Sequence, residues 1–223
     1  MSILYKVIYF FIFVQDNKSK PLKKILPIFS YVFHPLFISI YASMFYLFFK
    51  GDIFVNEEKI FILFQILIIT VFVPMLFFLL LRSTGNVDSI MINETSQRKI
   101  PLVLHCFLII LLVKRSVVIM RYPELHFFFL GALFSTIIAL ILSFCKIKAS
   151  LHMIAISGLT VFAIGLYRHL QVPNMMYWVA FFILMNGFVA SSRLEMNAHT
   201  NKELVIGLLI GIIPQLMFAF FWL

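Results

Sequence analysis

Charged residues are scarce in this sequence. They make up 12% of its 223 residues, and only 9 are Asp or Glu, whereas about 25% of a soluble domain is charged. Hydrophobic residues make up 63%, and Phe alone occurs 28 times. A soluble fold of this length has too little interior to bury so much apolar surface. The composition therefore excludes a soluble globular domain, a disordered chain and a fibrous repeat, and it indicates a membrane protein.

Other absences narrow the class further. The two cysteines, Cys106 and Cys145, lie in or beside apolar stretches and form neither a disulfide framework nor a metal pair, so they do not reveal a redox compartment. The apolar runs are continuous and do not alternate, which excludes a β-barrel. The sequence has no detectable internal repeat and no acidic cluster suited to a metal ion.

Long uncharged runs predict an all-α, polytopic membrane bundle of six to seven transmembrane helices, because a helix needs about 20 apolar residues to cross a bilayer. We expect six uncharged runs to span: 25–49, 60–81, 125–145, 149–167, 170–192 and 204–223. A seventh segment, 100–120, is interrupted by Lys114 and Arg115. We expect it to be a short spanning helix, with a re-entrant helix as the alternative.

The spans form a single transmembrane domain, residues 25–223, behind an N-terminal segment. Residues 1–14 are apolar but too short to span, so we expect an anchor at the membrane interface. Residues 15–24 are a polar, basic linker. Residues 1–24 together are therefore interpreted as an interfacial and basic segment.

The net charge of +9 is unevenly distributed along the chain. If all seven segments span, residues 15–24, 82–99, 146–148 and 193–203 share one membrane face, here called face A. The other face, face B, then holds residues 50–59, 114–124 and 168–169. Most of the 18 Lys and Arg residues fall on face A. Cations in short loops between apolar runs suit lipid headgroups or a phosphate better than nucleic acid.

The loop before the last apolar run has the most informative pattern. It reads Ser192-Arg193, five residues, His199, three residues, Glu203. On a helix, His199 and Glu203 would lie one turn apart, and the carboxylate would hold the imidazole as the orienting acid of a catalytic triad does. Arg193 offers a planar fork that suits phosphate oxygens. Taken alone, this segment is interpreted equally well as a polar loop with a chance histidine.

A second segment, residues 146–153 (KIKASLHM), places Lys148, Ser150 and His152 at the start of an apolar run. It again brings a cation together with an acid/base group. Taken alone, the simpler interpretation is an interfacial histidine behind lysines whose side chains extend to the headgroups.

Together, the two segments resemble the last two signature motifs of the type-2 phosphatidic acid phosphatase superfamily, which are membrane lipid-phosphate phosphatases. The third family motif is Ser-Arg, five residues, His, three residues, Asp. It is matched at Ser192, Arg193 and His199, with Glu203 in place of Asp. The second motif, Pro-Ser-Gly-His, corresponds to residues 149–152 (ASLH).

The first family motif, Lys, six residues, Arg-Pro, has two candidates. One is Arg98 with Pro101 on face A, and the other is Lys114 with Arg121 on face B. A phosphate site must converge to within a few ångströms, so the shared face favours Arg98, and Lys148 is taken as the substitute for the motif lysine. Some small bacterial members are similar, with Arg-x-x-Pro and then Lys-x-Ser-x-His. We therefore expect a protein of the bacterial inner (cell) membrane.

The resemblance implies a six-helix catalytic core and a metal-independent phosphatase that acts on a lipid phosphate or a prenyl (di)phosphate. His199 would attack phosphorus and form a phosphohistidine, Glu203 would orient it, and His152 would protonate the leaving oxygen and then activate water. The residues implied in phosphate binding are Arg193, Lys148, Arg98 and Ser150. No cofactor is implied, and the expected partners are the lipid-phosphate substrate and membrane lipids.

Several alternatives stay open. The substrate could be phosphatidic acid, phosphatidylglycerol phosphate, a polyprenyl diphosphate or a lipid A phosphate. A lipid phosphotransferase would use the same phosphohistidine, and a transporter or inactive relative would only bind the lipid phosphate. The loop 83–99 is interpreted as a lid or headgroup reader, or as a simple connector. The histidines expected to be structural are His34, His105, His126 and His169.

Overall fold

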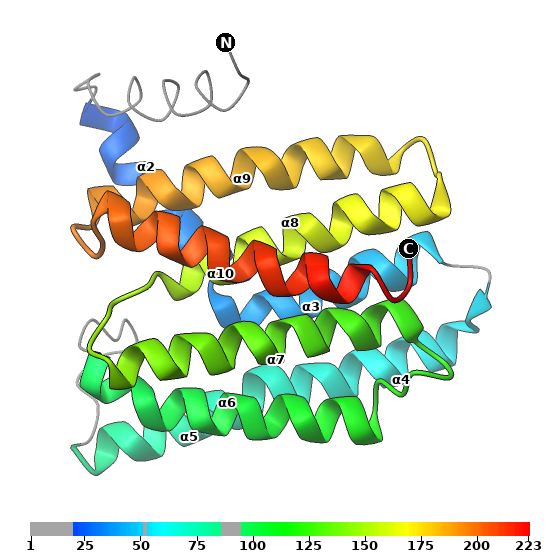
Figure 1. The fold of residues 1–223 in the computed structure, drawn as a ribbon, viewed down its shortest axis with the longest axis horizontal. Coiled ribbons are helices and arrows are strands. Elements are labelled where there is room, and N and C mark those ends of the chain that lie inside the picture. Colours follow the sequence, from blue (N-terminus) through cyan, green and yellow to red (C-terminus); the bar gives the residue numbers. More distant parts are fainter. Residues whose placement is uncertain (1–19, 51–52, 86–94) are drawn as a thin grey trace.

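The computed structural model describes residues 20–50, 53–85 and 95–223, and all regular structure in these ranges is helical (Figure 1). The helices are α2 (Lys20–Val32), α3 (Pro35–Phe49), α4 (Asn56–Leu67), α5 (Val73–Ser83), α6 (Thr95–Arg115), α7 (Pro123–Phe144), α8 (Leu151–Leu170), α9 (Met175–Glu195) and α10 (Asn201–Ala219). The anchor expected in residues 1–14 and the middle of the 83–99 loop lie outside the described residues.

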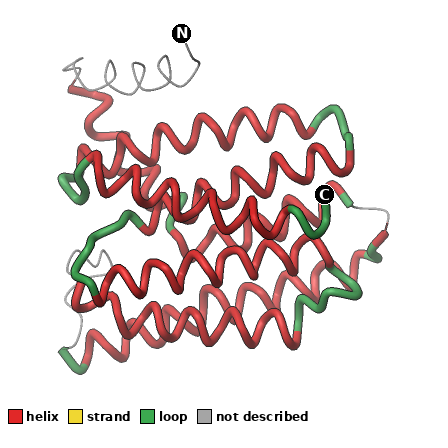
Figure 2. Tube along the Cα trace, viewed as in Figure 1, coloured by secondary structure: helices red, strands yellow, loops and turns green. Residues whose placement is uncertain are grey.

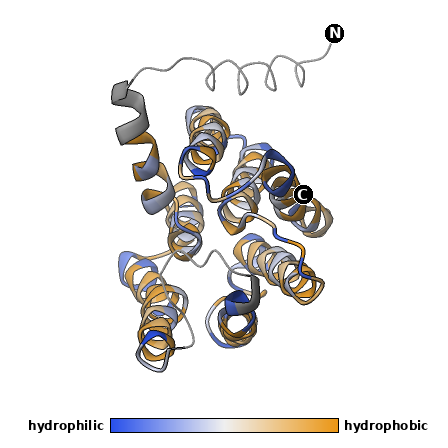
Figure 3. Cartoon of the chain, turned by 90° about the vertical axis from the view of Figure 1, so that its left-hand side faces the viewer, coloured by the Kyte–Doolittle hydropathy of each residue, from blue (hydrophilic) through white to orange (hydrophobic). Residues whose placement is uncertain are grey.

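The helices form a polytopic membrane bundle. Five of the described helical stretches are long and apolar enough to cross a bilayer, or six if the bent pair α2 and α3 counts as one span. Large hydrophobic side chains such as Phe48 and Phe220 point outward, as lipid contact requires. Seen end-on in Figure 3, the outer faces of the helices are largely hydrophobic. The chain is therefore an integral membrane protein.

The seventh expected segment forms a full-length helix. α6 has 21 residues and packs along α7, but it is not among the candidate spans found within the described residues. It also begins earlier than expected, at Thr95, so Arg98 lies on a helix and not in the 83–99 loop.

The first apolar run, predicted as one helix over 25–49, is broken in the structure. α2 and α3 meet at an angle of 66°. Pro35 causes the break, because proline disfavours helical geometry in the residue before it, and His34 is extended (φ −63°, ψ 141°). The His34 Nδ1 caps α3 by accepting a hydrogen bond from the Leu36 N–H (3.4 Å).

A second irregularity lies in the long helix from Asn56 to Ser83. Ile68–Phe72 form a π-helical turn two residues before Pro74, which has no N–H to donate. The wider π-helical turn lets the helix from Asn56 to Ser83 continue past the proline inside the membrane.

Small residues bring α10 close to α8. A Cβ on Gly211 would lie 2.0 Å from the Ser157 Oγ and 2.3 Å from the Ile154 carbonyl oxygen, and a Cβ on Gly207 would lie 2.6 Å from the Ser150 carbonyl oxygen. Only glycine permits this separation, as at many membrane helix interfaces. The close packing holds the first turn of α10 against the start of α8.

The loops gather at two ends of the bundle (Figure 2). The C-termini of α5, α7 and α9 and the N-termini of α6, α8 and α10 lie at one end (Figure 1, left), which corresponds to face A. At the other end, the carboxylate of Glu124 is 2% exposed and accepts hydrogen bonds from Lys50 Nζ (2.5 Å) and Tyr46 Oη (3.0 Å). The buried Glu124 carboxylate at face B is therefore paired within the protein.

Candidate active site

A cavity of about 390 Å³ opens among α3, α5, α6, α7 and α8 and reaches the face A end of the bundle. Most of its lining is apolar, as is usual for a small-molecule site. The charged and imidazole side chains that line it are Arg98, Arg193, His34, His105, His152 and His199. Of the described residues that line it, none is Asp or Glu. The cavity thus combines a cationic region with an apolar interior, which suits an amphipathic anion.

His199 lies in the loop between α9 and α10, two residues before α10 begins. Its Nδ1 lies 2.7 Å from the Glu203 Oε2. The expected contact four residues apart is present, although His199 itself is not helical. An ionised carboxylate can only accept, so Nδ1 carries the proton and Nε2 presents a lone pair. This leaves the imidazole in the tautomer that a nucleophile requires.

The environment of His199 keeps the ring neutral. Burial, followed by the positive charges of Arg193, Arg98 and Lys148, lowers the pKa of His199 to about 4, while the hydrogen bond to Glu203 opposes this shift. At neutral pH the imidazole is therefore unprotonated at one nitrogen and able to react.

Two arginines from different helices line the same cavity. Arg193, in the last turn of α9, is 3% exposed, and Arg98, in the first turn of α6, is 4% exposed. Arg98 Nη1 donates to the Ala149 carbonyl oxygen (3.0 Å), which fixes α6 to the chain just before α8. Guanidinium groups have the planar donor geometry that suits carboxylate or phosphate oxygens.

His152 reaches the cavity from the first turn of α8. Its Nε2 lies 3.1 Å from the Ser30 carbonyl oxygen on α2. Because a carbonyl only accepts, Nε2 carries the proton and Nδ1 is left to exchange a proton with a ligand. The Ser30 hydroxyl also bonds to the Ser192 hydroxyl (2.6 Å), so α2 holds both motif segments.

The structure also explains the role of Ser150, which was expected to bind phosphate. It is fully buried and is not among the cavity-lining residues, and its hydroxyl caps α8 by accepting from the Met153 N–H (3.4 Å). Its own N–H donates to the Glu203 carbonyl oxygen (3.2 Å). This contact joins the starts of α8 and α10, so Ser150 positions the two motif segments next to each other.

Lys148 is half-exposed and does not line the cavity, but its charge acts on His199. Of the residues predicted for the site, the structure therefore brings Arg98, His152, Arg193 and His199 to one cavity. It places Glu203 behind His199, and leaves Lys148 and Ser150 at the edge.

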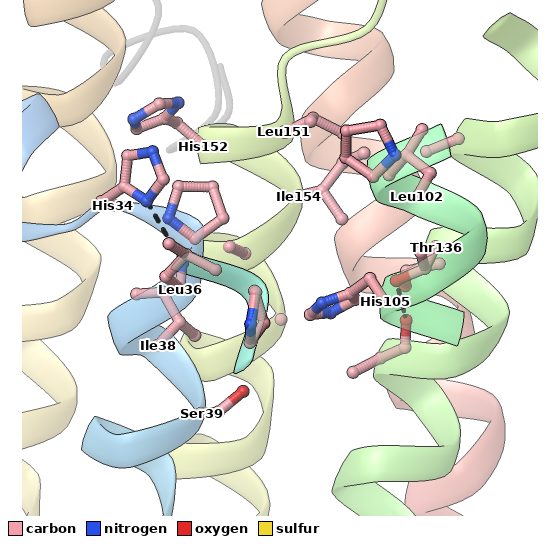
Figure 4. A pocket seen from close by; sticks show the side chains of 18 of the residues that line it. His34, Leu36, Ile38, Ser39, Leu102, His105, Thr136, Leu151, His152 and Ile154 are labelled. Carbon is pink, nitrogen blue, oxygen red and sulfur yellow. Dashed lines mark hydrogen bonds between the residues drawn. The ribbon is translucent and has the colours of Figure 1, made fainter. Parts of the chain in front are cut away.

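Two cavity residues, His34 and His105, were not expected from the sequence. His34, read as structural, lies at the α2–α3 break, with its ring 5.2 Å from the ring of His152 in an edge-on arrangement (Figure 4). The His34-Pro35 pair could have predicted the break at this position, because the residue before a proline disfavours helical backbone geometry. His105, also read as structural, points from α6 into the cavity (Figure 4).

The alternative candidate for the first family motif, Lys114 with Arg121, lies at the face B end of the bundle, opposite the cavity residues Arg98 and Arg193. Arg121 forms an ion pair with Glu58, and Tyr122 Oη donates to the same carboxylate (2.8 Å). His126 and His169 also lie away from the cavity, bonded to the Val117 carbonyl oxygen (2.7 Å) and paired with Glu124 (3.4 Å).

Within the described residues, no group of three His, Cys, Asp or Glu is placed to hold a metal ion. Comparisons with protein-family models, with curated proteins and with solved structures find no match.

Proposed function

We propose that the chain is an integral membrane phosphatase that hydrolyses a lipid phosphate or prenyl (di)phosphate through a phosphohistidine, as in the type-2 phosphatidic acid phosphatases. The main support is the convergence of His199, His152, Arg98 and Arg193 on one largely apolar cavity. The match of Ser192, Arg193 and His199 to the third family motif adds to it. We place the protein in the bacterial inner (cell) membrane.

In the first step, the lone pair on His199 Nε2 attacks phosphorus and forms the N–P bond, while the bond from phosphorus to the lipid oxygen breaks. When a lipid phosphate binds with one proton on its phosphoryl group, His152 Nδ1 takes up that proton and then gives it to the leaving oxygen, which departs as a lipid alcohol. Glu203 stabilises the positive charge that develops on His199. Arg98 and Arg193 neutralise the phosphoryl oxygens.

In the second step, water attacks phosphorus on the phosphohistidine. His152 Nδ1 takes a proton from this water, and the electron pair of the N–P bond returns to His199 Nε2 as phosphate leaves. Once His152 has passed this proton to the leaving phosphate, both histidines regain their starting protonation, and the net reaction consumes one water for each lipid phosphate.

The test is phosphate release by the purified, detergent-solubilised protein from a panel of lipid phosphates. We expect the wild type to release phosphate, and His199→Ala to lose all activity above background. His126→Ala, which changes a histidine outside the cavity, is the matched control and is expected to remain active. Equal activity of His199→Ala and wild type, or no release by wild type from any member of the panel, would contradict the proposal.

Two related functions give different results in the same assay. A lipid phosphotransferase would pass the phosphoryl group to an added lipid alcohol, so product analysis with that acceptor would reveal a new phospholipid. A transporter or inactive relative would bind the lipid phosphate without releasing phosphate. Trapping of an acid-labile phosphoryl group that is absent from His199→Ala would exclude this last alternative.

A further inference from the structure

The interior of the cavity contains polar groups that the proposed reaction does not use. One face of α6 lines the cavity through Arg98, Pro101, Leu102 and His105, the spacing of a single helix face. His105 is two turns further along the helix than Arg98, which corresponds to about 10 Å at 1.5 Å per residue. The imidazole therefore lies well inside the bundle, away from the phosphate-binding end.

Most polar side chains at this depth are already hydrogen-bonded. The Ser135 hydroxyl donates to the Ile210 carbonyl oxygen (2.9 Å), the Thr136 hydroxyl to the Ala132 carbonyl oxygen (2.7 Å), and the Gln215 Nε2 to the Phe128 carbonyl oxygen (2.9 Å). The two hydroxyl donors and one of the two N–H donors of Gln215 are therefore committed to the backbone.

His105 and Ser39 are different. Both line the cavity, from α6 and α3, and neither side chain has a hydrogen-bond partner in the part of the chain that the structure describes. Figure 4 shows the His105 imidazole pointing into the cavity, with Ser39 among the labelled residues of α3. A donor that is left unpaired when an apolar ligand fills the cavity costs about 1–3 kcal/mol, so a ligand that supplies an acceptor here is favoured.

We propose that His105 and Ser39 form a second polar subsite that donates hydrogen bonds to an ester carbonyl of a glycerolipid phosphate. This inference rests on the proposed function. In a glycerolipid phosphate, the ester carbonyls are separated from phosphorus by several bonds, so a phosphate at Arg98 and Arg193 directs them into the cavity. The second phosphate of a diphosphate follows after a single bridging oxygen and stays at the cationic end.

The same geometry discriminates against prenyl phosphates. A prenyl chain has no acceptor beyond its phosphate, so binding it would leave both donors unpaired in an apolar environment. Sites built to hydrogen-bond a substrate reject analogues that lack the partner group, because the buried polar groups of the site are then left unsatisfied. The subsite thus selects glycerolipid over prenyl substrates.

The experiment compares a diacylglycerol phosphate with its dialkyl ether analogue, which lacks the carbonyls, and with a polyprenyl phosphate. Turnover (kcat/KM) and binding, measured as ligand-induced thermal stabilisation, are determined for the full chain. We expect the wild type to favour the ester over the ether by roughly threefold to tenfold, the value of one hydrogen bond. His105→Leu brings this ratio close to one, and His105→Gln, which keeps a donor, restores part of it. Phe107→Leu, on the exposed side of the same helix, keeps the wild-type ratio.

An ester-to-ether ratio that is the same in wild type and His105→Leu would overturn the subsite, as would a wild-type preference for the polyprenyl phosphate. If the wild type releases phosphate from none of the three lipids, the proposed function fails. The ratio of binding affinities then decides on the subsite by itself, so the two failures remain distinguishable.

Discussion

The contact between His199 and Glu203 allows the proposed mechanism to be tested by a single conservative change. Glu203→Gln replaces the carboxylate with an amide whose oxygen can still accept from His199 Nδ1, so the tautomer is retained and only the negative charge is lost. The backbone of residue 203 keeps its role, since its carbonyl oxygen accepts from the Ser150 N–H. Glu203→Ala removes both the charge and the acceptor.

The size of the effect follows from the geometry. The bond from His199 Nδ1 to Glu203 Oε2 is 2.7 Å, and its net contribution as a hydrogen bond to a charged group is about 1.5–3 kcal/mol. The Glu203 side chain is 22% exposed, so solvent screening favours the lower half of that range. At 1.36 kcal/mol for each factor of ten, Glu203→Gln should lower kcat by roughly 10- to 50-fold. KM should change little, because the arginines hold the phosphate.

The assay is steady-state phosphate release by wild type, Glu203→Gln and Glu203→Ala, with size-exclusion chromatography to confirm that each variant is folded. We expect kcat to fall in the order wild type, Gln, Ala. A folded Glu203→Gln variant whose kcat stays within a factor of two of wild type would show that the carboxylate does not assist His199. The proposed division of roles would then be wrong.

The remaining predictions concern Arg193, His199 and the contact between α8 and α10. Arg193→Lys should raise KM about tenfold or more, because a lysine cannot form the two parallel bonds of a guanidinium with phosphate; kinetics with one lipid phosphate would measure it. The imidazole of His199, identified by its loss in His199→Gln, should titrate in NMR near 4 and not near 6.5. Because this pKa is lowered by folding, the unfolded chain binds the proton first, so stability should decrease as pH falls from about 6.5 to 4 and should be unaffected by this group above 6.5. Gly211→Val should lower the thermal unfolding midpoint by several degrees and reduce activity, because its side chain would collide with Ser157 and Ile154.

The spans could be predicted from sequence because lipid imposes a simple rule on composition. Uncharged runs of about 20 residues identified α7, α8, α9 and α10 to within a few residues at most of their ends. The same rule failed to predict the bend at His34 and Pro35, because hydropathy averaged over a run does not report a change of helix direction at one residue. The break has a local stereochemical cause, which a residue-by-residue analysis of the X-Pro pair would have detected.

Among the residues in and around the cavity, some could also be predicted from local sequence, and others depend on how the helices pack. The spacing from Arg193 to His199 and Glu203 is local, so it could be read as a motif, and the Arg98 prediction followed from the grouping of loops on one face. No local sequence pattern indicated a role for Ser30. Its contacts with His152 and Ser192 join residues more than a hundred positions apart, and they depend on the path that α2 takes after the break. His105 was missed because a histidine in an apolar run shows its orientation only once the helices are packed.

Charged residues have different surroundings at the two ends of the bundle. At face B, Glu124 and Glu58 each accept from cationic or phenolic groups of other segments of the chain, so these ion pairs connect separate parts of the bundle. At face A, Arg98 and Arg193 line a cavity whose described lining has no carboxylate, and His199 is kept neutral beside them. Bringing two like charges together in a buried place opposes folding, since each is desolvated and they repel one another. An anion with an apolar tail would complement both the positive charge of the two arginines and the apolar walls of this cavity.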